Sequence, residues 1–204
     1  MYKRYVTAFL GSDKLPIVVY FSHRGEHLIN GKIQSIQVGN TETVAYKISR
    51  QLECPCVEIV PVTAYPQKYT ELLVKIEAEK KLNDLNDRGA IYPLEKDIAS
   101  AYSIFLGYPN WLGTLPKPIV SFLQETDLAN KLIYPFCTHE GSGFGRSLLD
   151  LKILAPASTI KTGLPIRGSR VLRSDKAIEN WLIQFYESNN RQEDLKHAKT
   201  NSWT

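Results

Sequence analysis

The chain has 204 residues, a length that suits one domain with a sizeable core. Hydrophobic residues make up 43% of it and charged residues 23%, the mix of an ordinary globular protein. The net charge is only +4 and the basic residues are scattered, which disfavours nucleic-acid binding, and no apolar run reaches membrane-span length. We therefore expect a cytoplasmic protein with no membrane span.

Short apolar runs alternate with helical patterns along the chain. The apolar runs predict strands near residues 16–21, 57–61, 103–107, 131–136 and 164–166. The helical patterns predict helices near residues 41–52, 67–85, 117–125, 145–153 and 174–188. We interpret residues 1–15 as an N-terminal extension, 16–188 as one domain and 189–204 as a polar, frayed tail. Apolar strands that alternate with helices indicate an α/β fold, a parallel sheet with helices on both faces.

The cysteines and histidines are few. Cys54, Cys56 and Cys137 do not suggest a disulfide framework, and no second pair of ligands completes a metal site beside them. His23 and His27 are four residues apart, but a glycine between them argues against a helix that would bring them together. We therefore expect reduced thiols and no metal ion.

Ligands of such sheets bind beyond the carboxyl ends of the strands, which selects the loops 22–41, 108–116 and 137–145. In the first loop, Ser22 follows a strand, and Gly39-Asn40-Thr41 opens a helix whose free N–H groups and dipole favour an anion. This pattern indicates a phosphate-binding loop whose two halves are separated by residues 23–38. An ordinary helix cap at Asn40 or Thr41 is the plainer alternative.

The other two loops have features of a ligand site. Trp111, in the second loop, could stack on a flat ring, or it could fold onto the core. In the third loop, Gly141, Gly143 and Gly145 would let the backbone approach a ligand, or would only make the start of a helix flexible. Their spacing, and their place after the fourth strand, disfavour a Rossmann nicotinamide site.

The loops together resemble a known family. Five segments in chain order are similar to motifs of the flavodoxin-like flavoproteins: Tyr20-Phe21-Ser22, Gly39-Asn40-Thr41-Glu42, residues 107–113, residues 135–145 and residues 163–168. The resemblance implies a three-layer flavodoxin-like fold, with a five-stranded parallel sheet in the order 2-1-3-4-5, and FMN as the cofactor. It places the FMN phosphate at the first loop and the isoalloxazine ring between the other two. The cofactor-binding residues that it implies are Ser22, His23, Arg24, Gly39, Asn40, Thr41, Pro109, Asn110, Trp111, Leu112, Gly113, Thr138, His139, Glu140, Gly141, Ser142, Gly143, Phe144 and Gly145.

The sequence also departs from the short flavodoxin pattern. Arg24 stands where a threonine is usual, and it would either bond the phosphate bidentately or lie exposed in the loop. Leu112 replaces a second aromatic residue that many relatives have. The inserted residues 23–38 would either cover the phosphate side of the flavin or form a homodimer contact. The chain is mildly basic where flavodoxins are acidic, which puts docking to a basic reductase in doubt.

Two functions are compatible with these residues. One is an FMN-dependent oxidoreductase that moves electrons from NAD(P)H to a quinone-like acceptor. The alternative is an electron carrier between redox partner proteins, without a small substrate of its own. A module without flavin is disfavoured by the glycine-rich loop and Trp111. We assign no catalytic residue, because the flavin would do the chemistry, although His139 or Glu140 would either assist proton transfer or only shape their loop.

Overall fold

The computed structural model of the protein describes residues 15–81, 89–96 and 98–200, with residues 190–200 as backbone alone. The extension expected at residues 1–15 lies outside the described part of the chain, except for its last residue. The strands are β1 (Ile17–Tyr20), β2 (Gly25–Ile29), β3 (Lys32–Ile36), β4 (Cys56–Glu58), β5 (Ser103–Pro109), β6 (Leu132–His139), β7 (Thr159–Ile160) and β8 (Leu164–Arg167). The helices are α2 (Asn40–Leu52), α3 (Tyr69–Lys81), α4 (Lys117–Glu125), α5 (Ser147–Leu154), the 3₁₀ helix η2 (Gly168–Arg173) and α6 (Asp175–Thr200).

The main sheet is parallel and has the order β4-β1-β5-β6, with both β7 and β8 paired to the outer edge of β6. This order confirms the predicted α/β fold and its 2-1-3-4-5 sheet. The fifth position, however, is shared by two short strands. β7 pairs with the start of β6 and β8 with its end, and only β8 was expected from the sequence.

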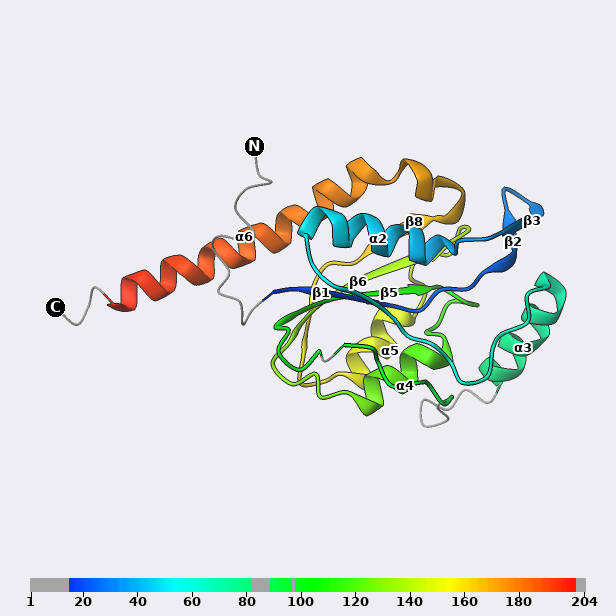
Figure 1. Ribbon diagram of the computed structural model, residues 1–204, viewed down its shortest axis with the longest axis horizontal. Coiled ribbons are helices and arrows are strands. Elements are labelled where there is room, and N and C mark those ends of the chain that lie inside the picture. Colours follow the sequence, from blue (N-terminus) through cyan, green and yellow to red (C-terminus); the bar gives the residue numbers. More distant parts are fainter. Residues whose placement is uncertain (1–14, 82–88, 97, 201–204) are drawn as a thin grey trace.

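Helices cover both faces of the sheet, α2 and α6 on one face and α4 and α5 on the other (Figure 1). Side chains of a strand alternate between the faces, so β1 contributes to two cores. Val18 packs in the core that includes Val44 of α2 and Ile178 of α6, whereas Val19 packs in the core that includes Ile119 of α4 and Leu151 of α5. The apolar residues expected in the strands and helices therefore form the two cores that cover the faces of the sheet.

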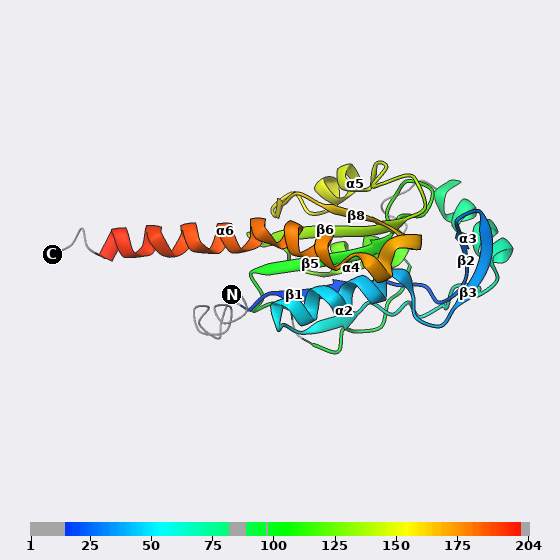
Figure 2. The same cartoon turned by 90° about the horizontal axis from the view of Figure 1, so that it is seen from above.

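Several elements extend beyond their predicted ends. β5 continues to Pro109 and β6 to His139, because β5 pairs with β6 as far as Pro109 and Thr138, and β6 pairs with β8 as far as His139. This pairing places Pro109, Thr138 and His139, three of the expected cofactor-binding residues, at the edge of the sheet. α6 continues to Thr200 rather than ending near residue 188, and its second half projects away from the sheet (Figure 2). Within the described residues, no helix is both long enough and apolar enough to cross a membrane.

Residues 23–38, expected as an open loop, form an antiparallel hairpin of β2 and β3. Its turn is Asn30-Gly31, with φ of 50° and 76°, the pair of positive values that a two-residue hairpin turn of this type requires. An Asn-Gly pair is a strong hairpin signal, and the prediction of a loop overlooked it. The neighbouring helix α3 does not cover a face of the sheet but lies beside the hairpin, past the carboxyl edge of the strands (Figure 1).

Candidate functional site

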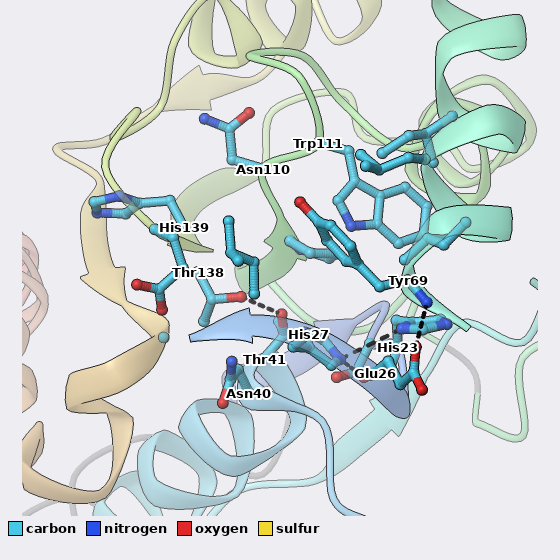
Figure 3. A pocket seen from close by; sticks show the side chains of 18 of the residues that line it. His23, Glu26, His27, Asn40, Thr41, Tyr69, Asn110, Trp111, Thr138 and His139 are labelled. Carbon is cyan, nitrogen blue, oxygen red and sulfur yellow. Dashed lines mark hydrogen bonds between the residues drawn. The ribbon is translucent and has the colours of Figure 1, made fainter. Parts of the chain in front are cut away.

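A cavity of about 180 Å³ lies at the carboxyl edge of the sheet (Figure 3). Its walls come from the ends of β1, β5 and β6, the start of α2, the hairpin and α3. The lining residues are Ser22, His23, Glu26, His27, Leu28, Asn40, Thr41, Tyr69, Leu72, Leu73, Ile76, Pro109, Asn110, Trp111, Leu112, Thr138, His139, Glu140 and Gly168. This is the position that the parallel sheet predicts for a ligand.

The two halves of the first loop meet at the start of α2. The Ser22 hydroxyl accepts a hydrogen bond from the backbone N–H of Glu42 (3.1 Å), so it caps the helix from the end of β1. A Cβ atom on Gly39 would lie 2.6 Å from the carbonyl oxygen of His23, and only glycine allows this approach. The backbone N–H groups of Asn40 and Thr41, the first two of α2, have no acceptor among the residues that the structure describes. The predicted meeting of Ser22 with Asn40 and Thr41 is thus observed.

Two sets of contacts connect the cavity-lining residues beside the start of α2 to neighbouring elements. The hydroxyls of Thr41 and Thr138 share a hydrogen bond of 2.8 Å, which joins α2 to the end of β6. Glu140 turns toward η2, where its carboxylate accepts a hydrogen bond from the backbone N–H of Ser169 (2.8 Å) and approaches Arg167 (3.4 Å). Both Thr138 and Glu140 therefore bind neighbouring elements as well as lining the cavity.

Arg24 is not among the cavity-lining residues. Its guanidinium donates to both carboxylate oxygens of Glu42 (3.0 and 3.1 Å) and to the carboxylate of Glu58 (3.0 Å). The Glu42 carboxylate in turn accepts the N–H of Gly39 (3.3 Å), so the ion pair steadies the carboxylate that caps the start of α2. These hydrogen bonds raise the pKa of the Arg24 guanidinium. The arrangement does not match the phosphate contact that was one of the two roles expected for Arg24.

The hairpin and α3 together form a cover over one side of the cavity. Glu26 binds the start of α3 twice: its N–H donates to the carbonyl of Gln67 (2.7 Å), and its carboxylate accepts the N–H of Tyr69 (2.9 Å). Gly25 approaches the same segment so closely that a Cβ atom would lie 2.6 Å from the Gln67 carbonyl oxygen. The apolar side chains that this cover contributes to the cavity are Leu28, Leu72, Leu73 and Ile76.

Two histidines, His23, which is buried, and His27, which is partly buried, connect the cover to the rest of the protein. His23 donates from Nε2 to the carbonyl of Pro66 (2.8 Å), and His27 donates from Nε2 to the carbonyl of His23 (3.1 Å). His23 Nδ1 lies 3.3 Å from His27 Nε2 and is then the acceptor, because its own proton is on Nε2. Burial lowers the pKa of both rings, so both are neutral at pH 7. Across the described residues, no group of three potential metal ligands is present.

Trp111 folds onto the core, one of the two alternatives considered for it, and still reaches the cavity. Its indole packs edge-on against Phe21 (ring centres 5.4 Å apart) and Tyr65 (4.8 Å), and it also lines the cavity. These contacts with Phe21 and Tyr65 hold the indole in one orientation at the cavity wall. Next to it, Leu112 has a φ of 50° and is partly exposed at the edge of the cavity.

The glycine-rich loop folds back on itself. The backbone N–H groups of Gly141 and Gly143 both donate to Nδ1 of His139, at 2.9 and 3.1 Å. On the other side, the Asn110 amide nitrogen donates to the Ser142 hydroxyl (3.1 Å) and to the carbonyl of Gly143 (2.5 Å). As a result the N–H groups of Gly141 and Gly143 are bonded within the protein instead of being available to a ligand. The predicted site residues that the structure does not bring to the cavity are Arg24, Gly39, Gly113, Gly141, Ser142, Gly143, Phe144 and Gly145.

The structure also adds residues that the sequence did not indicate. Most of them belong to the cover, and one lies at the start of η2: Glu26, His27, Leu28, Tyr69, Leu72, Leu73, Ile76 and Gly168. The Asn30-Gly31 turn could have revealed the hairpin, and with it the first three of these residues. We find no comparable signal for the helix residues.

Comparisons with known proteins agree with this architecture. A flavodoxin family model matches residues 34–185. A provisionally assigned flavoprotein from Bacteroides eggerthii is 26% identical, with a TM-score of 0.64, and the match covers 82% of this chain and 94% of that chain. A flavoprotein from Lactobacillus acidophilus NCFM, solved in complex with FMN, is 18% identical, with a TM-score of 0.58, and the match covers 82% and 98% of the two chains. No curated protein matches the chain. Because the family model spans well over half of its residues, this chain belongs to the flavodoxin family.

Proposed function

We propose that this protein binds FMN and acts as an oxidoreductase that moves electrons from NAD(P)H to a quinone-like acceptor. The observation that carries the proposal is the start of α2, where the N–H groups of Asn40 and Thr41 point to no acceptor among the described residues and the Ser22 hydroxyl lies beside them. Free amides at a helix N-terminus are a ready site for a phosphate group. Membership of the flavodoxin family, and the FMN in the Lactobacillus flavoprotein, support the same ligand.

The residues at this end of the cavity fit a phosphate. Asn40 and Thr41 would hold it through backbone N–H groups, and Ser22 and Thr41 also through their hydroxyls, with the helix dipole adding partial positive charge. The two carboxylates that line the cavity, Glu26 and Glu140, each already accept a hydrogen bond from a backbone N–H group. When bound, FMN would supply the uptake and release of electrons, and the protein would supply orientation and a shielded environment.

The size of the cavity has a consequence for binding. At about 180 Å³ it is smaller than the roughly 300–1,000 Å³ of typical small-molecule sites. The strands and α2 belong to the packed frame, whereas the hairpin and α3 lie outside it. We therefore expect the hairpin and α3 to move outward together when the nucleotide enters, because Glu26 ties one to the other.

The cover favours the oxidoreductase over the carrier. Its leucine and isoleucine side chains make one wall of the cavity apolar, as a small, flat acceptor would require, and they stand between the cavity and solvent. A carrier needs an exposed route from the flavin to its protein partner. Leu112, 38% exposed at the edge of the cavity, is the observation that favours the carrier as the second candidate.

The first experiment is the visible spectrum of the purified protein, followed by titration with FMN. We expect a yellow protein, or a colourless one that binds added FMN; a protein that does neither overturns the proposal. Steady-state oxidation of NADPH with a quinone acceptor then separates the candidates. Rapid turnover supports the oxidoreductase, whereas negligible turnover, together with two resolved one-electron steps in a redox titration, supports the carrier.

Three further expectations belong to the same proposal. We propose that residues 16–188 form the functional domain, that the protein works in the cytoplasm, and that the hairpin covers the cavity instead of forming a homodimer contact. The three cysteines are free, which suits a reducing compartment. Sedimentation analysis of the full chain checks the last point, because a hairpin-dependent dimer would assign the hairpin the other role.

A further inference from the structure

His139 makes an unusual pair of contacts at the end of β6. A single ring nitrogen, Nδ1, accepts hydrogen bonds from two backbone N–H groups, those of Gly141 (2.9 Å) and Gly143 (3.1 Å). A nitrogen that accepts hydrogen bonds carries no proton, so the ring proton of neutral His139 is on Nε2. The contacts therefore exist only while the ring is neutral. Protonated His139 would carry a hydrogen on Nδ1, facing two N–H donors.

The opposite side of the loop is also held by the protein. The carbonyl of Gly143 accepts a hydrogen bond from the Asn110 amide and a weak one from the Cys137 thiol (3.4 Å). We call this arrangement the closed loop: its Gly141 and Gly143 N–H groups donate to His139, and its Gly143 carbonyl accepts from Asn110. This closed arrangement is incompletely satisfied, because Asn110 Oδ1 is buried without a hydrogen-bond donor in the part of the chain that the structure describes. This oxygen at the cavity wall is an acceptor that the closed arrangement leaves open for a rearranged loop or for a ligand.

We propose that His139 is a positioning residue that controls the glycine-rich loop through its protonation state. When neutral, His139 holds the N–H groups of Gly141 and Gly143; when protonated, it releases them to donate to the polar edge of a bound flavin ring. The proposal rests on the proposed function for its ligand, and it adds a regulation of that site. Binding of a flavin that uses these two amides then takes up one proton at His139.

The surroundings of His139 allow it to titrate. The ring is partly exposed, so solvent can protonate it. Partial burial lowers its pKa; of the two charged neighbours, Glu140 acts to raise the pKa and Arg167 of β8 acts to lower it. The two N–H donors stabilise the neutral ring and act in the same direction as burial. The other cavity histidines, His23 and His27, lie at the opposite end of the cavity (Figure 3). Because these two rings can also titrate, the pH experiment needs a control variant for each of them.

The direction of the pH effect follows from linkage. In the free protein the two amides favour neutral His139, and in the flavin complex they are withdrawn, so the pKa of His139 is higher in the complex. The complex therefore binds more protons than the free protein between these two pKa values. Flavin affinity should rise as the pH falls through this window, by at most about tenfold per pH unit for one proton.

The loop itself can be tested without any flavin. We would record ¹⁵N NMR spectra of the full chain from pH 8 to pH 5, for the wild type and for His139→Asn. The asparagine oxygen replaces Nδ1 as an acceptor but does not titrate. We expect the amide signals of Gly141 and Gly143 to move together with the His139 ring in the wild type, and to stay constant in His139→Asn. Glycine amides that ignore the titration of His139, or that move equally in the variant, would overturn the proposal.

The consequence for the ligand is tested with FMN and with riboflavin, which lacks the phosphate and its ionisation near pH 6. We expect the wild type to bind both more tightly as the pH falls, with a slope of up to about tenfold per unit. His139→Asn should bind weakly at every pH, and His139→Ala, whose amides are always free, tightly at every pH. His23→Gln and His27→Gln remove the other two titrating rings of the cavity, and a slope that is lost in either of them but survives in His139→Asn would also refute the inference. Equal slopes in the wild type and His139→Asn would refute the inference; if neither flavin binds at any pH, the proposed function fails, while the NMR titration still decides the role of His139.

Discussion

Two regions on opposite sides of one cavity differ in how they are built. The phosphate end, formed by the end of β1 and the start of α2, belongs to the packed frame: Ser22 is 7% exposed and Thr41 1%. The cover, formed by the hairpin and α3, lies beyond the frame and is attached mainly through Glu26 and His23. We infer that the phosphate end supplies affinity and that the cover controls access.

The two regions also differ in whether the N–H groups at the start of their helix have an acceptor. At the phosphate end, two helix N–H groups have no acceptor among the described residues, an arrangement that suits an incoming anion. In the cover, the Glu26 carboxylate takes the corresponding N–H group of α3. One helix start is thus available to a ligand, and the other is closed by the protein itself. Substitutions in the two regions should therefore differ in how strongly they change FMN affinity and stability.

The largest effect should come from the double substitution Ser22→Ala, Thr41→Ala. Each hydroxyl is expected to donate to the phosphate, and a hydrogen bond to a charged group contributes about 1.5–3 kcal/mol, so FMN affinity should fall by a factor of about 100 or more. Fluorescence titration with FMN measures it.

Thr43→Ala is the matched control for this double substitution, because the Thr43 hydroxyl donates to the carbonyl of Gly39 (3.1 Å) and Thr43 does not line the cavity. This control should keep the wild-type affinity. Equal losses in both proteins would mean that the substitutions act through the stability of α2 and not through the phosphate.

The next effect should come from Gly25→Ala, which disturbs the cover. Gly25 has a φ of 117°, and an added Cβ atom would meet the Gln67 carbonyl oxygen at 2.6 Å. Backbone strain and overpacking each cost about 1–3 kcal/mol, so we expect hydrogen exchange to rise across the hairpin and α3. FMN affinity should change far less than in the double substitution.

Gly31→Ala separates the two causes. Gly31 also has a positive φ, 76°, but nothing lies within 4 Å of an added Cβ atom. This variant should therefore raise exchange in the hairpin turn and leave α3 protected. If Gly25→Ala also leaves α3 protected, the hairpin and α3 do not form one cover.

The two regions also differ in how far the sequence could predict them. The ends of apolar strands, and the Gly-Asn-Thr helix start, locate the phosphate end, because parallel strands bring their carboxyl ends to one edge whatever the loops contain. Residues that are far apart in the chain, Ser22 and Thr41, could therefore be paired from the sequence alone. The sheet order was also predicted correctly, but it came from the resemblance to the flavodoxin-like flavoproteins and not from the ends of the strands.

The cover could not be predicted in this way. Glu26 caps a helix that begins 43 residues later, at Tyr69, and no local pattern records that contact. The glycine-rich loop posed a different problem: its glycines predicted free amides, but His139 accepts two of them. Glycine spacing shows where a backbone can approach a ligand, and it does not show which neighbour reaches the amides first.

A pH effect on stability should be smaller and should come from the cover. Burial lowers the pKa of His23 and His27, so the unfolded chain binds protons more readily than the folded one. Stability is complete above a pH of about 6.5 and is lost as the pH falls through that value, by up to about 0.7 kcal/mol per histidine between pH 7 and pH 6. Urea unfolding at the two pH values measures it.

His23→Gln removes one titrating ring, while its amide nitrogen can still donate to the carbonyl of Pro66. The loss of stability between pH 7 and pH 6 should be smaller in this variant than in the wild type. The difference between the two proteins isolates the histidine from every other titrating group. An unchanged loss would show that the histidine pair does not hold the cover at neutral pH.

The smallest effect should come from Arg24→Met, at the junction of the two regions. Its guanidinium contacts Glu42 and Glu58, but the side chain is 48% exposed, so solvent screens the ion pairs and we expect a loss of stability below about 1 kcal/mol. FMN affinity should stay within a factor of about three of the wild type, because the guanidinium is committed to carboxylates. Glu58→Gln removes one of the same ion pairs without touching Arg24, and should have an equally small effect on affinity. A tenfold loss of affinity in Arg24→Met alone would show that the guanidinium leaves Glu42 for the phosphate, and the junction would then belong to the phosphate end.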